Sequence, residues 1–321
     1  MRIMNSLKEL AKALKKSKKV ALFTHISPDS DALGSVFAMY HALNSLGKQA
    51  VIFIEENYSD ANKHLIDEKL INRDVCNSSD FDTFLCCDAS SLQRLGKYAE
   101  VFDIKNNTIV LDHHYCTKHI ARFNHIDASM SSCSELVYEL LKIMKVRFNN
   151  KILSYIYMGL TSDTNSFINS NTNAHSFKVA YELAKAGVDM NAINEALFRS
   201  VTKTEIRFKQ FLWTNYKIDK DIAYIIVRYK DLQELQGDNK DCSGYSAKLL
   251  TIDKVKYSFS LVEKEPGLIS LSMRSRKGSN VRSVAEKLGG GGHICAAGAK
   301  FKGTNLNKIK KEIIQSIRDQ Q

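Results

Sequence analysis

The stretch THISPDSD, residues 24–31, carries one imidazole and two carboxylates within eight residues. His25, Asp29 and Asp31 follow the short apolar run 20–23 and precede a helical pattern. Two carboxylates at alternate positions repel each other unless something positive lies between them, and a divalent metal ion is the simplest candidate. The alternative is a loop in which Asp29 or Asp31 only caps the helix that follows, because Asp is a favoured N-cap residue.

Residues of the same kind occur at three more places, namely Asp88, the run Asp112, His113 and His114, and Asp163. Three of the four places follow predicted strands, whose carboxyl ends meet at one edge of a parallel sheet. Imidazole and carboxylate ligands without thiolate suit Mn²⁺ better than structural zinc, and four carboxylates favour two ions over one. Two ions roughly 3.5–4 Å apart would hold an attacking water and clamp a phosphoryl oxygen, as in two-metal phosphoester hydrolysis.

Short apolar runs at 20–24, 50–54, 83–87 and 108–111 alternate with helical patterns. This alternation predicts βαβ units and a mostly parallel sheet flanked by helices. Helical patterns then follow at 132–144 and 152–160, and again from 172 to 213 with breaks at Gly187 and near Ser200. The last of these segments carries no chemically loaded motif and is interpreted as a connector.

After Lys217 the chain becomes rich in β-branched and aromatic residues, in runs at 222–229, 255–264 and 268–275. A helix is expected at 281–288 and a basic helix from Leu306 onward. The chain is therefore predicted to be α/β throughout. It would comprise a metal-binding domain at 1–190, a helical connector at 191–216 and a smaller α/β substrate-binding domain at 217–321.

A run of four glycines ends at His293 and predicts an anion site in the second domain. Gly290, Gly291 and Gly292 let backbone N–H groups approach a phosphate closely. Residues 294–297 are expected to start a helix whose N-terminus favours negative charge. We therefore expect Gly290 to His293 to hold a phosphate or a nucleotide end, with a merely flexible turn as the alternative.

The composition narrows the class of protein. The formal charge of +11 favours nucleic acid or nucleotide phosphate as the partner, although a lysine-rich solvated surface would give the same number. Seven cysteines without a CxxC pair indicate reduced thiols and exclude a disulfide framework or zinc ribbon. No apolar run is long enough to span a bilayer, and the basic N-terminal helix lacks a signal-peptide core, so a soluble cytoplasmic protein is expected.

The motifs THISPDSDALGS, FLCCDASSLQRLG, LDHHYC, GLTSDTNSF, SMRSR and GGGGHICAAGA stand in this order along the chain. With them the sequence resembles the DHH/DHHA1 phosphoesterases, most closely the two-domain NrnA type, an oligoribonuclease that also dephosphorylates 3′-phosphoadenosine 5′-phosphate (pAp). The resemblance implies two Mn²⁺ ions, or other divalent ions, with Asp88 and Asp163 shared or bridging. The implied ligands are His25, Asp29, Asp31, Asp88, His113 and Asp163.

The resemblance also implies roles for residues beside the metals. Asp112 would orient His113, and His114 would donate a hydrogen bond or a proton at the phosphate. Arg274 would contact the substrate, whereas an ion pair is the preferred interpretation of Arg94. A homodimer through the first domain is implied as well. His41, His64, His119, His125 and His175 lie outside every motif and are interpreted as structural.

The function expected is Mn²⁺-dependent hydrolysis of short oligoribonucleotides from one end, which releases nucleoside monophosphates, with pAp phosphatase activity as a second reaction. Three alternatives are weighed against it. A phosphodiesterase for cyclic dinucleotides or pApA is the nearest, although the sensor and membrane segments of the larger enzymes of that kind are not seen. A long-strand exonuclease would need a further oligonucleotide-binding domain. A nucleic-acid-binding module with an inactive metal site is the alternative from another class.

Overall fold

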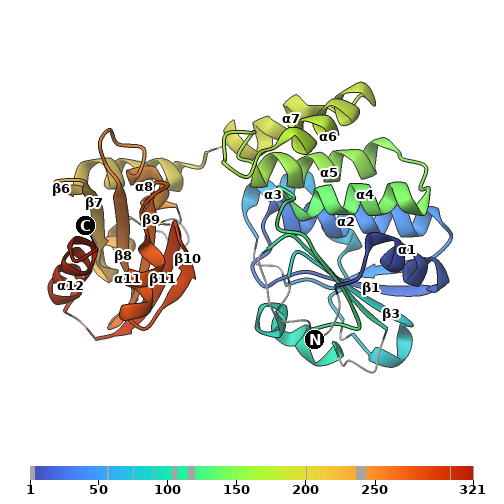
Figure 1. Ribbon diagram of the computed structural model, residues 1–321, viewed down its shortest axis with the longest axis horizontal. Helices are drawn as coiled ribbons and strands as arrows, with labels where there is room; N and C mark the ends of the chain where they lie inside the picture. The colour runs from blue at the N-terminus through green and yellow to red at the C-terminus, as the bar shows by residue number, and fades with distance from the viewer. Residues whose placement is uncertain are drawn as a thin grey trace. The chain divides into compact units, whose positions relative to one another are not determined.

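The computed structural model describes residues 4–55, 58–74, 76–89, 91–102, 107–114, 120–199, 201–235, 242, 244–303 and 305–320 (Figure 1). The chain divides into two compact units, residues 1–200 and 201–321, and the predicted connector spans the point of division. His119 lies outside the described residues. Among the described helices, none combines the length and apolarity needed to cross a bilayer.

The first unit is built on a five-stranded parallel sheet in the order β2-β1-β3-β4-β5. The strands are β1 (Lys19–Phe23), β2 (Gln49–Ile52), β3 (Thr83–Cys87), β4 (Thr108–Asp112) and β5 (Phe123–Ile126). All residues of β3 and β4 are buried, because helices and loops cover both faces of the sheet. The predicted α/β fold with a mostly parallel sheet is thus confirmed, and β5 is a strand that the sequence analysis did not anticipate.

The helices of this unit are α1 (Leu7–Lys16), α2 (Ser30–Ser45), α3 (Asp60–Leu65), α4 (Cys133–Met144), α5 (Asn150–Asp163), α6 (Ala174–Lys185) and α7 (Met190–Asn194). Short 3₁₀ segments lie at Glu68–Leu70, Ser78–Asp80 and Leu92–Val101, and a π-helical turn at Glu195–Arg199.

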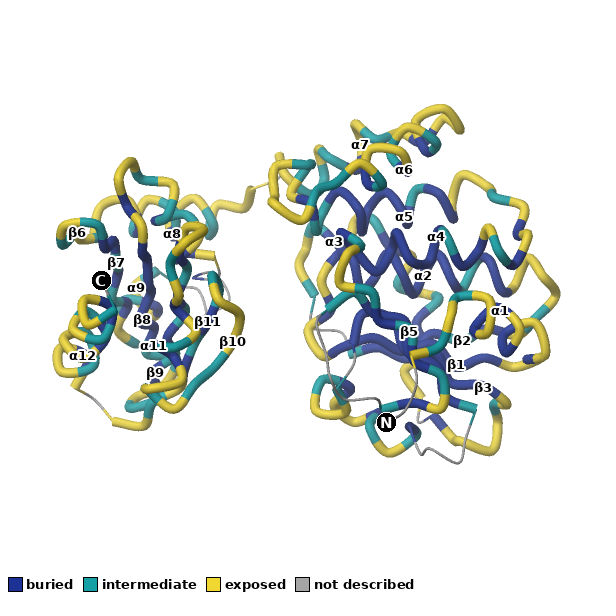
Figure 2. Tube along the Cα trace, viewed as in Figure 1, coloured by how far each residue is buried: buried dark blue, intermediate teal, exposed yellow. Residues whose placement is uncertain are grey.

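Helices α2, α4 and α5 pack together and form most of the buried core in Figure 2. Two glycines allow α2 and α5 to approach at backbone distance. A Cβ on Gly34 would lie 2.4 Å from the carbonyl oxygen of Tyr155, and one on Gly159 would lie 2.4 Å from Asp31 Oδ1. The start of α2 is therefore held tightly against the C-terminal end of α5.

The second unit contains a six-stranded mixed sheet in the order β10-β11-β9-β8-β7-β6. Its strands are β6 (Lys217–Asp219), β7 (Ile222–Val227), β8 (Tyr257–Glu265), β9 (Leu268–Ser275), β10 (Gly291–His293) and β11 (Ala296–Lys302). Its helices are α8 (Lys203–Asn215), α9 (Tyr229–Glu234), α10 (Tyr245–Leu249), α11 (Val281–Lys287) and α12 (Leu306–Arg318). Helices α11 and α12 cover one face of the sheet, and α8 and α10 pack on the other face.

The glycine run corrects one sequence prediction. Residues 294–297 do not start a helix. Ile294 and Cys295 turn between β10 and β11, and Ala296 and Ala297 begin β11 opposite His293 and Gly292. Ala297 and Ala299 alternate into the core at 7% exposure, which is the period of a strand. Gly290 allows the close approach, because a Cβ there would lie 2.1 Å from the carbonyl oxygen of Gly298. The prediction that a helix begins after the glycine run is therefore wrong, because the run belongs to a β-hairpin.

Candidate functional site

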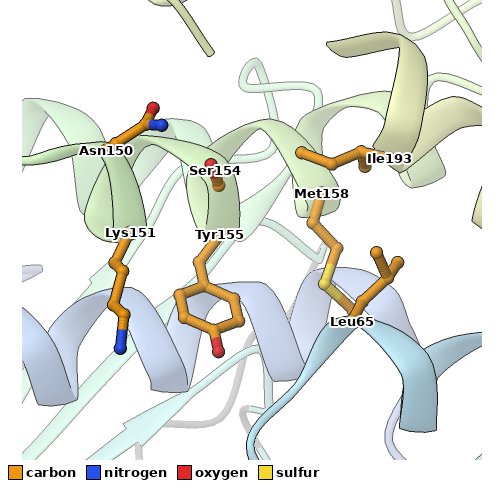
Figure 3. A pocket seen from close by; sticks show the side chains of 7 residues that line it. All are labelled: Leu65, Asn150, Lys151, Ser154, Tyr155, Met158 and Ile193. Atoms are coloured by element: carbon orange, nitrogen blue, oxygen red, sulfur yellow. The ribbon is translucent and has the colours of Figure 1, made fainter. Parts of the chain in front are cut away.

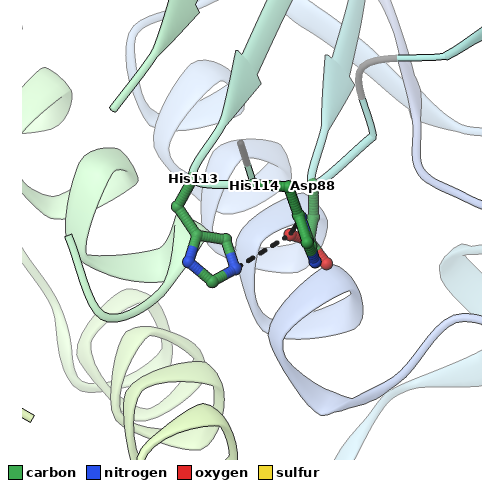
Figure 4. Close-up of side chains that lie close together, drawn as sticks. All are labelled: Asp88, His113 and His114. Carbon is green, nitrogen blue, oxygen red and sulfur yellow. Dashed lines mark ion pairs between the residues drawn. The ribbon is translucent and has the colours of Figure 1, made fainter. Parts of the chain in front are cut away.

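The candidate metal ligands of the first unit, together with His114, lie where strands β1, β3 and β4 end. His25 follows β1, Asp88 follows β3, and His113 and His114 follow β4. The start of α2 brings Asp29 and Asp31 to the same place, and α5 ends there at Asp163. Figure 4 shows the side chains of Asp88, His113 and His114 turned toward one another.

One set of side chains is formed by His25, Asp29 and Asp88, whose ligand atoms lie within 4.8 Å of one another. His25 Nε2 is 3.5 Å from Asp88 Oδ2 and 3.9 Å from Asp29 Oδ2. This set contains one imidazole nitrogen and two carboxylates, which is a suitable donor set for a hard to borderline divalent ion.

A second set is formed by Asp31, His113 and Asp163 within the same spacing. His113 Nε2 lies 3.1 Å from Asp163 Oδ2 and 3.8 Å from Asp31 Oδ2. It also lies 3.5 Å from Asp88 Oδ1, so Asp88 directs one carboxylate oxygen to each set. Two adjoining sets that share one carboxylate are the arrangement expected of a two-ion site.

The two histidines present unpartnered nitrogens to these carboxylates. His25 Nδ1 lies 2.8 Å from the carbonyl oxygen of Ile26, and His113 Nδ1 lies 3.3 Å from that of Met130. We infer that Nδ1 carries the proton in each ring, which directs the Nε2 lone pair into the site. Within the described part of the chain, both Nε2 atoms and Asp88 Oδ1 are buried without a hydrogen-bond partner. Buried polar atoms are rarely left so, and a cation between them would satisfy all three.

Asp29 and Asp31 each bind a helix N-terminus as well. Asp29 Oδ1 accepts from the backbone N–H groups of Asp31 and Ala32 at 3.1 and 3.0 Å, so the capping interpretation holds for this oxygen. Asp29 Oδ2 still faces His25. Asp31 is fully buried, and its carboxylate accepts from the N–H groups of Cys133 and Ser134 at 2.6 and 2.9 Å. The positive end of α4 therefore fixes the orientation of Asp31.

Asp112 contacts a different residue from the one expected. Its Oδ1 lies 2.8 Å from His114 Nδ1 and accepts the backbone N–H of His114 at 3.1 Å. Asp112 is the last residue of β4. The backbone turns after it, so the ring of His114 lies beside the Asp112 side chain. His113 is held by Met130 instead, so the expectation that Asp112 orients His113 is wrong.

The crowding of carboxylates shows in the pKa values. Burial and the charges of Asp163 and Asp88 raise the pKa of Asp31 well above its usual value. Burial opposes a charge on His113, yet Asp163, Asp31 and Asp88 raise its pKa to about 9. The hydrogen bond to Asp112 and the nearby carboxylate of Asp88 raise the pKa of His114 to about 11. The site thus has an excess of negative charge that attracts protons, and divalent cations would neutralise the same charge.

A polar network that the sequence analysis did not predict joins the end of α5, at Asp163, to the segment before α4. Asn171 Nδ2 donates to the carbonyl oxygens of Ser131 and Asp163 at 2.9 and 3.2 Å. The fully buried Glu135 accepts from the N–H and the hydroxyl of Ser131 at 2.7 and 2.6 Å. His175, interpreted from the sequence as structural, lies 3.1 Å from Glu135 Oε1. The sequence gives no local signal for this pairing, because forty positions separate the two residues.

The predicted substrate residues of the second unit lie on strand β9, which carries Arg274, and on strand β10 with the glycine just before it. Arg274 pairs across β11 with Ala296, which pairs with His293, so Arg274 and His293 share one face of the sheet. Burial lowers the pKa of Arg274. Arg276, which follows the end of β9, donates to the carbonyl oxygens of Val255 and Leu250 at 2.7 and 3.0 Å.

The three glycines of the hairpin differ in what packing requires of them. A Cβ on Gly290 or Gly292 would lie within 2.6 Å of backbone atoms of β11, whereas one on Gly291 would meet nothing within 4 Å. Packing therefore explains Gly290 and Gly292. Gly291 is the position at which an approaching ligand would gain from the missing side chain.

A cavity of about 220 Å³ lies elsewhere on the first unit, between α3, α5 and α7 (Figure 3). Leu65, Tyr155, Met158 and Ile193 line it, together with polar residues at the start of α5. None of the predicted metal ligands is among its lining residues, so the acidic site is distinct from this cavity.

Comparisons with known proteins agree with this arrangement. Residues 19–160 match the model of the DHH family, N-terminal domain, and residues 221–319 match the DHHA1 domain. A Thermus thermophilus protein named bifunctional oligoribonuclease and PAP phosphatase NrnA is 26% identical over 316 residues, which cover 94% of this chain and 90% of the relative.

Two solved structures share the fold. An exopolyphosphatase-related protein from Bacteroides fragilis has a TM-score of 0.88 at 24% identity and covers 98% of this chain and 95% of its own. The exonuclease RecJ bound to manganese has a TM-score of 0.55 at 15% identity, with 99% and 96% covered.

Proposed function

Because this chain belongs to the DHH family and carries a DHHA1 domain, we propose that it is a phosphoesterase that degrades short oligoribonucleotides to nucleoside monophosphates and also removes the 3′-phosphate of pAp. The observation that carries the proposal is the pair of adjoining ligand sets, to each of which Asp88 directs one oxygen, with two buried imidazole nitrogens and one carboxylate oxygen left without hydrogen-bond partners. Similarity over nearly the full length to a protein named for both reactions supports the choice of substrates.

We propose two Mn²⁺ ions, or other divalent ions, as the cofactor. The residues that would hold them are His25, Asp29, Asp31, Asp88, His113 and Asp163. Divalent ions bound there would supply a water of lowered pKa and neutralise charge on the phosphoryl oxygens. All six of these side chains already contact backbone groups or one another, so little ordering would be needed when ions bind.

His114 is the proposed donor to the phosphate. Its Nδ1 is engaged by Asp112 at 2.8 Å, and 37% of its side chain is exposed. Asp112 keeps the ring in one orientation and stabilises its protonated form. A protonated imidazole in this position would donate a hydrogen bond to a phosphoryl oxygen and give a proton to the leaving alkoxide.

In the second unit, we propose that Arg274, Gly290, Gly291, Gly292 and His293 bind the part of the substrate that is not cleaved. The guanidinium of Arg274 would pair with a phosphate or stack on a base. The backbone N–H of Gly291 would approach a phosphate oxygen, since packing leaves space there.

The proposal is tested by comparing rates on a five-nucleotide RNA, pApA, pAp and cyclic di-AMP in the presence of Mn²⁺, with the products identified by mass spectrometry. Nucleoside monophosphates from the RNA and AMP from pAp are expected. Cyclic di-AMP as the fastest substrate would favour the cyclic-dinucleotide phosphodiesterase instead, and binding of RNA without release of product would favour the non-catalytic module. The double variant Asp112→Ala, His113→Ala should lose all hydrolysis.

A further inference from the structure

We propose that an exposed aromatic surface beside Asp163 is a stacking site for a base of the RNA substrate. The surface, here called the aromatic face, consists of the exposed Ile168, Phe177 and Tyr181 and the half-buried Phe167. The inference rests on the proposed function, because it adds a subsite to the same metal centre. The base concerned is the second base of an oligonucleotide, because pAp has only one base.

The turn that follows Asp163 joins the metal centre to the aromatic face. Asn165, Ser166 and Phe167 have φ values of 47°, 55° and 67°, so three successive residues with side chains occupy the left-handed region. Each such residue is strained, and strained backbone clusters at functional positions. The strained turn directly follows a candidate metal ligand, so the side chains that it exposes are candidates for substrate contact.

Hydrogen bonds hold the strained turn in place. The N–H of Ser166 donates to the carbonyl oxygen of Thr161 at 2.7 Å, and that of Phe167 donates to Thr164 Oγ1 at 3.1 Å. Asn169 Nδ2 donates to the carbonyl oxygen of Asp163 at 2.9 Å. The position of Phe167 is therefore tied to that of Asp163.

The turn and helix α6 together present aromatic rings to solvent. The rings of Phe167 and Phe177 are stacked, with centroids 5.2 Å apart and ring planes inclined at 22° to each other. Phe177 is 57% exposed, Tyr181 one turn further along α6 is 61% exposed, and Ile168 is 77% exposed. Apolar side chains gathered in this way on a surface mark a binding site more often than scattered ones do.

The occupant that fits is a nucleobase with its phosphate. Lys185 lies one turn after Tyr181 on the exposed side of α6, and its Nζ is 5.8 Å from the centre of the Tyr181 ring. Aromatic rings interleaved with lysines are the combination that binds single-stranded RNA, because bases stack on the rings and the cations pair with phosphates. A second copy of this chain would gain from the apolar rings but would also have to bury the charge of Lys185.

The test compares Phe177→Ala, Phe177→Leu and Phe177→Trp on a five-nucleotide RNA and on pAp. Stacking on one aromatic ring is worth enough that Phe177→Ala should lower kcat/KM for the RNA by about 5- to 150-fold, chiefly through KM. Phe177→Trp should retain activity, and Phe177→Leu should behave as alanine does, because leucine keeps apolar volume without a π face. Rates on pAp should stay within about twofold of wild type.

Leu46→Ala is the matched control. Leu46 is 39% exposed and follows the C-terminal end of α2, about 26 Å along the helix from Asp29. Equal losses on RNA and pAp, or full activity of Phe177→Leu, would overturn the stacking site. So would a change of oligomeric state in Phe177→Ala by light scattering, which would identify the surface as a contact between copies. If wild type cleaves pAp but no RNA, the proposed function fails and the variants are not its cause.

Discussion

Gly159 offers a sharp test of how the fold positions Asp31. A Cβ at this position would lie 1.9 Å from Ser134 Oγ and 2.4 Å from Asp31 Oδ1, both too close for any real contact. Gly159→Ala must therefore push apart α5 and the start of α4, whose N–H groups hold the Asp31 carboxylate. The structure predicts that one methyl group disturbs stability and metal binding together.

The magnitude follows from the cost of overpacking a filled core, about 1–3 kcal/mol. For a unit of 200 residues this corresponds to a fall of about 2–12 °C in the melting temperature. Displacing Asp31 from its hydrogen bonds should weaken Mn²⁺ binding roughly 10- to 100-fold, as loss of supporting contacts usually does. Differential scanning calorimetry in EDTA and isothermal titration with Mn²⁺ measure the two effects separately.

Removing the nearer clash should restore part of the stability. In the double variant Gly159→Ala, Ser134→Ala, the fall in melting temperature should be smaller than the sum of the falls in the two single variants, because the hydroxyl at 1.9 Å is gone. The contact with Asp31 remains, so Mn²⁺ affinity should stay low. An alanine at Gly159 that leaves both the melting temperature and Mn²⁺ affinity at wild-type values would refute this account of the packing.

Three further predictions concern single residues. His175→Ala leaves the buried Glu135 carboxylate without its imidazole partner and should lower the free energy of unfolding by about 1–3 kcal/mol in urea; an unchanged midpoint would exclude the supporting network. Burial lowers the pKa of His41, so between that lowered value and 6.5 the unfolded chain binds the proton more tightly and the free energy of unfolding falls as pH drops. His41→Gln should therefore flatten the dependence of the melting temperature on pH from 7 to 5, and the same slope in the variant and the wild type would contradict this. Gly291→Ala should keep the melting temperature but raise KM for pAp, since no atom lies within 4 Å of the added methyl group; an unchanged KM would remove Gly291 from the binding site.

The sequence determined much of the fold because the signals involved are local. Apolar runs of strand length alternate with helical periods, and this was sufficient for the parallel sheet of the first unit and its α/β class. The same runs showed which residues stand at strand ends, so the gathering of His25, Asp88 and His113 could be predicted from topology alone. That these residues hold metal ions stays a prediction.

The glycine run shows where local signals are insufficient. Its sequence is compatible with a loop before a helix, and with a hairpin. Pairing of residues 291–293 with 296–298, and of β11 with β9, selects the hairpin. These pairings depend on the space that Gly290 and Gly292 leave beside β11, which no single segment specifies.

The tertiary structure alone decided how the side chains of the site are oriented. Asp88 divides its two oxygens between two ligand sets, Asp31 is held by the first turn of α4 a hundred residues away, and Asp112 contacts His114 instead of His113. Each outcome depends on distances of a few ångströms between segments far apart in the chain. Residue type and spacing fix which chemical groups are present, whereas packing of the whole unit fixes which lone pair faces which neighbour.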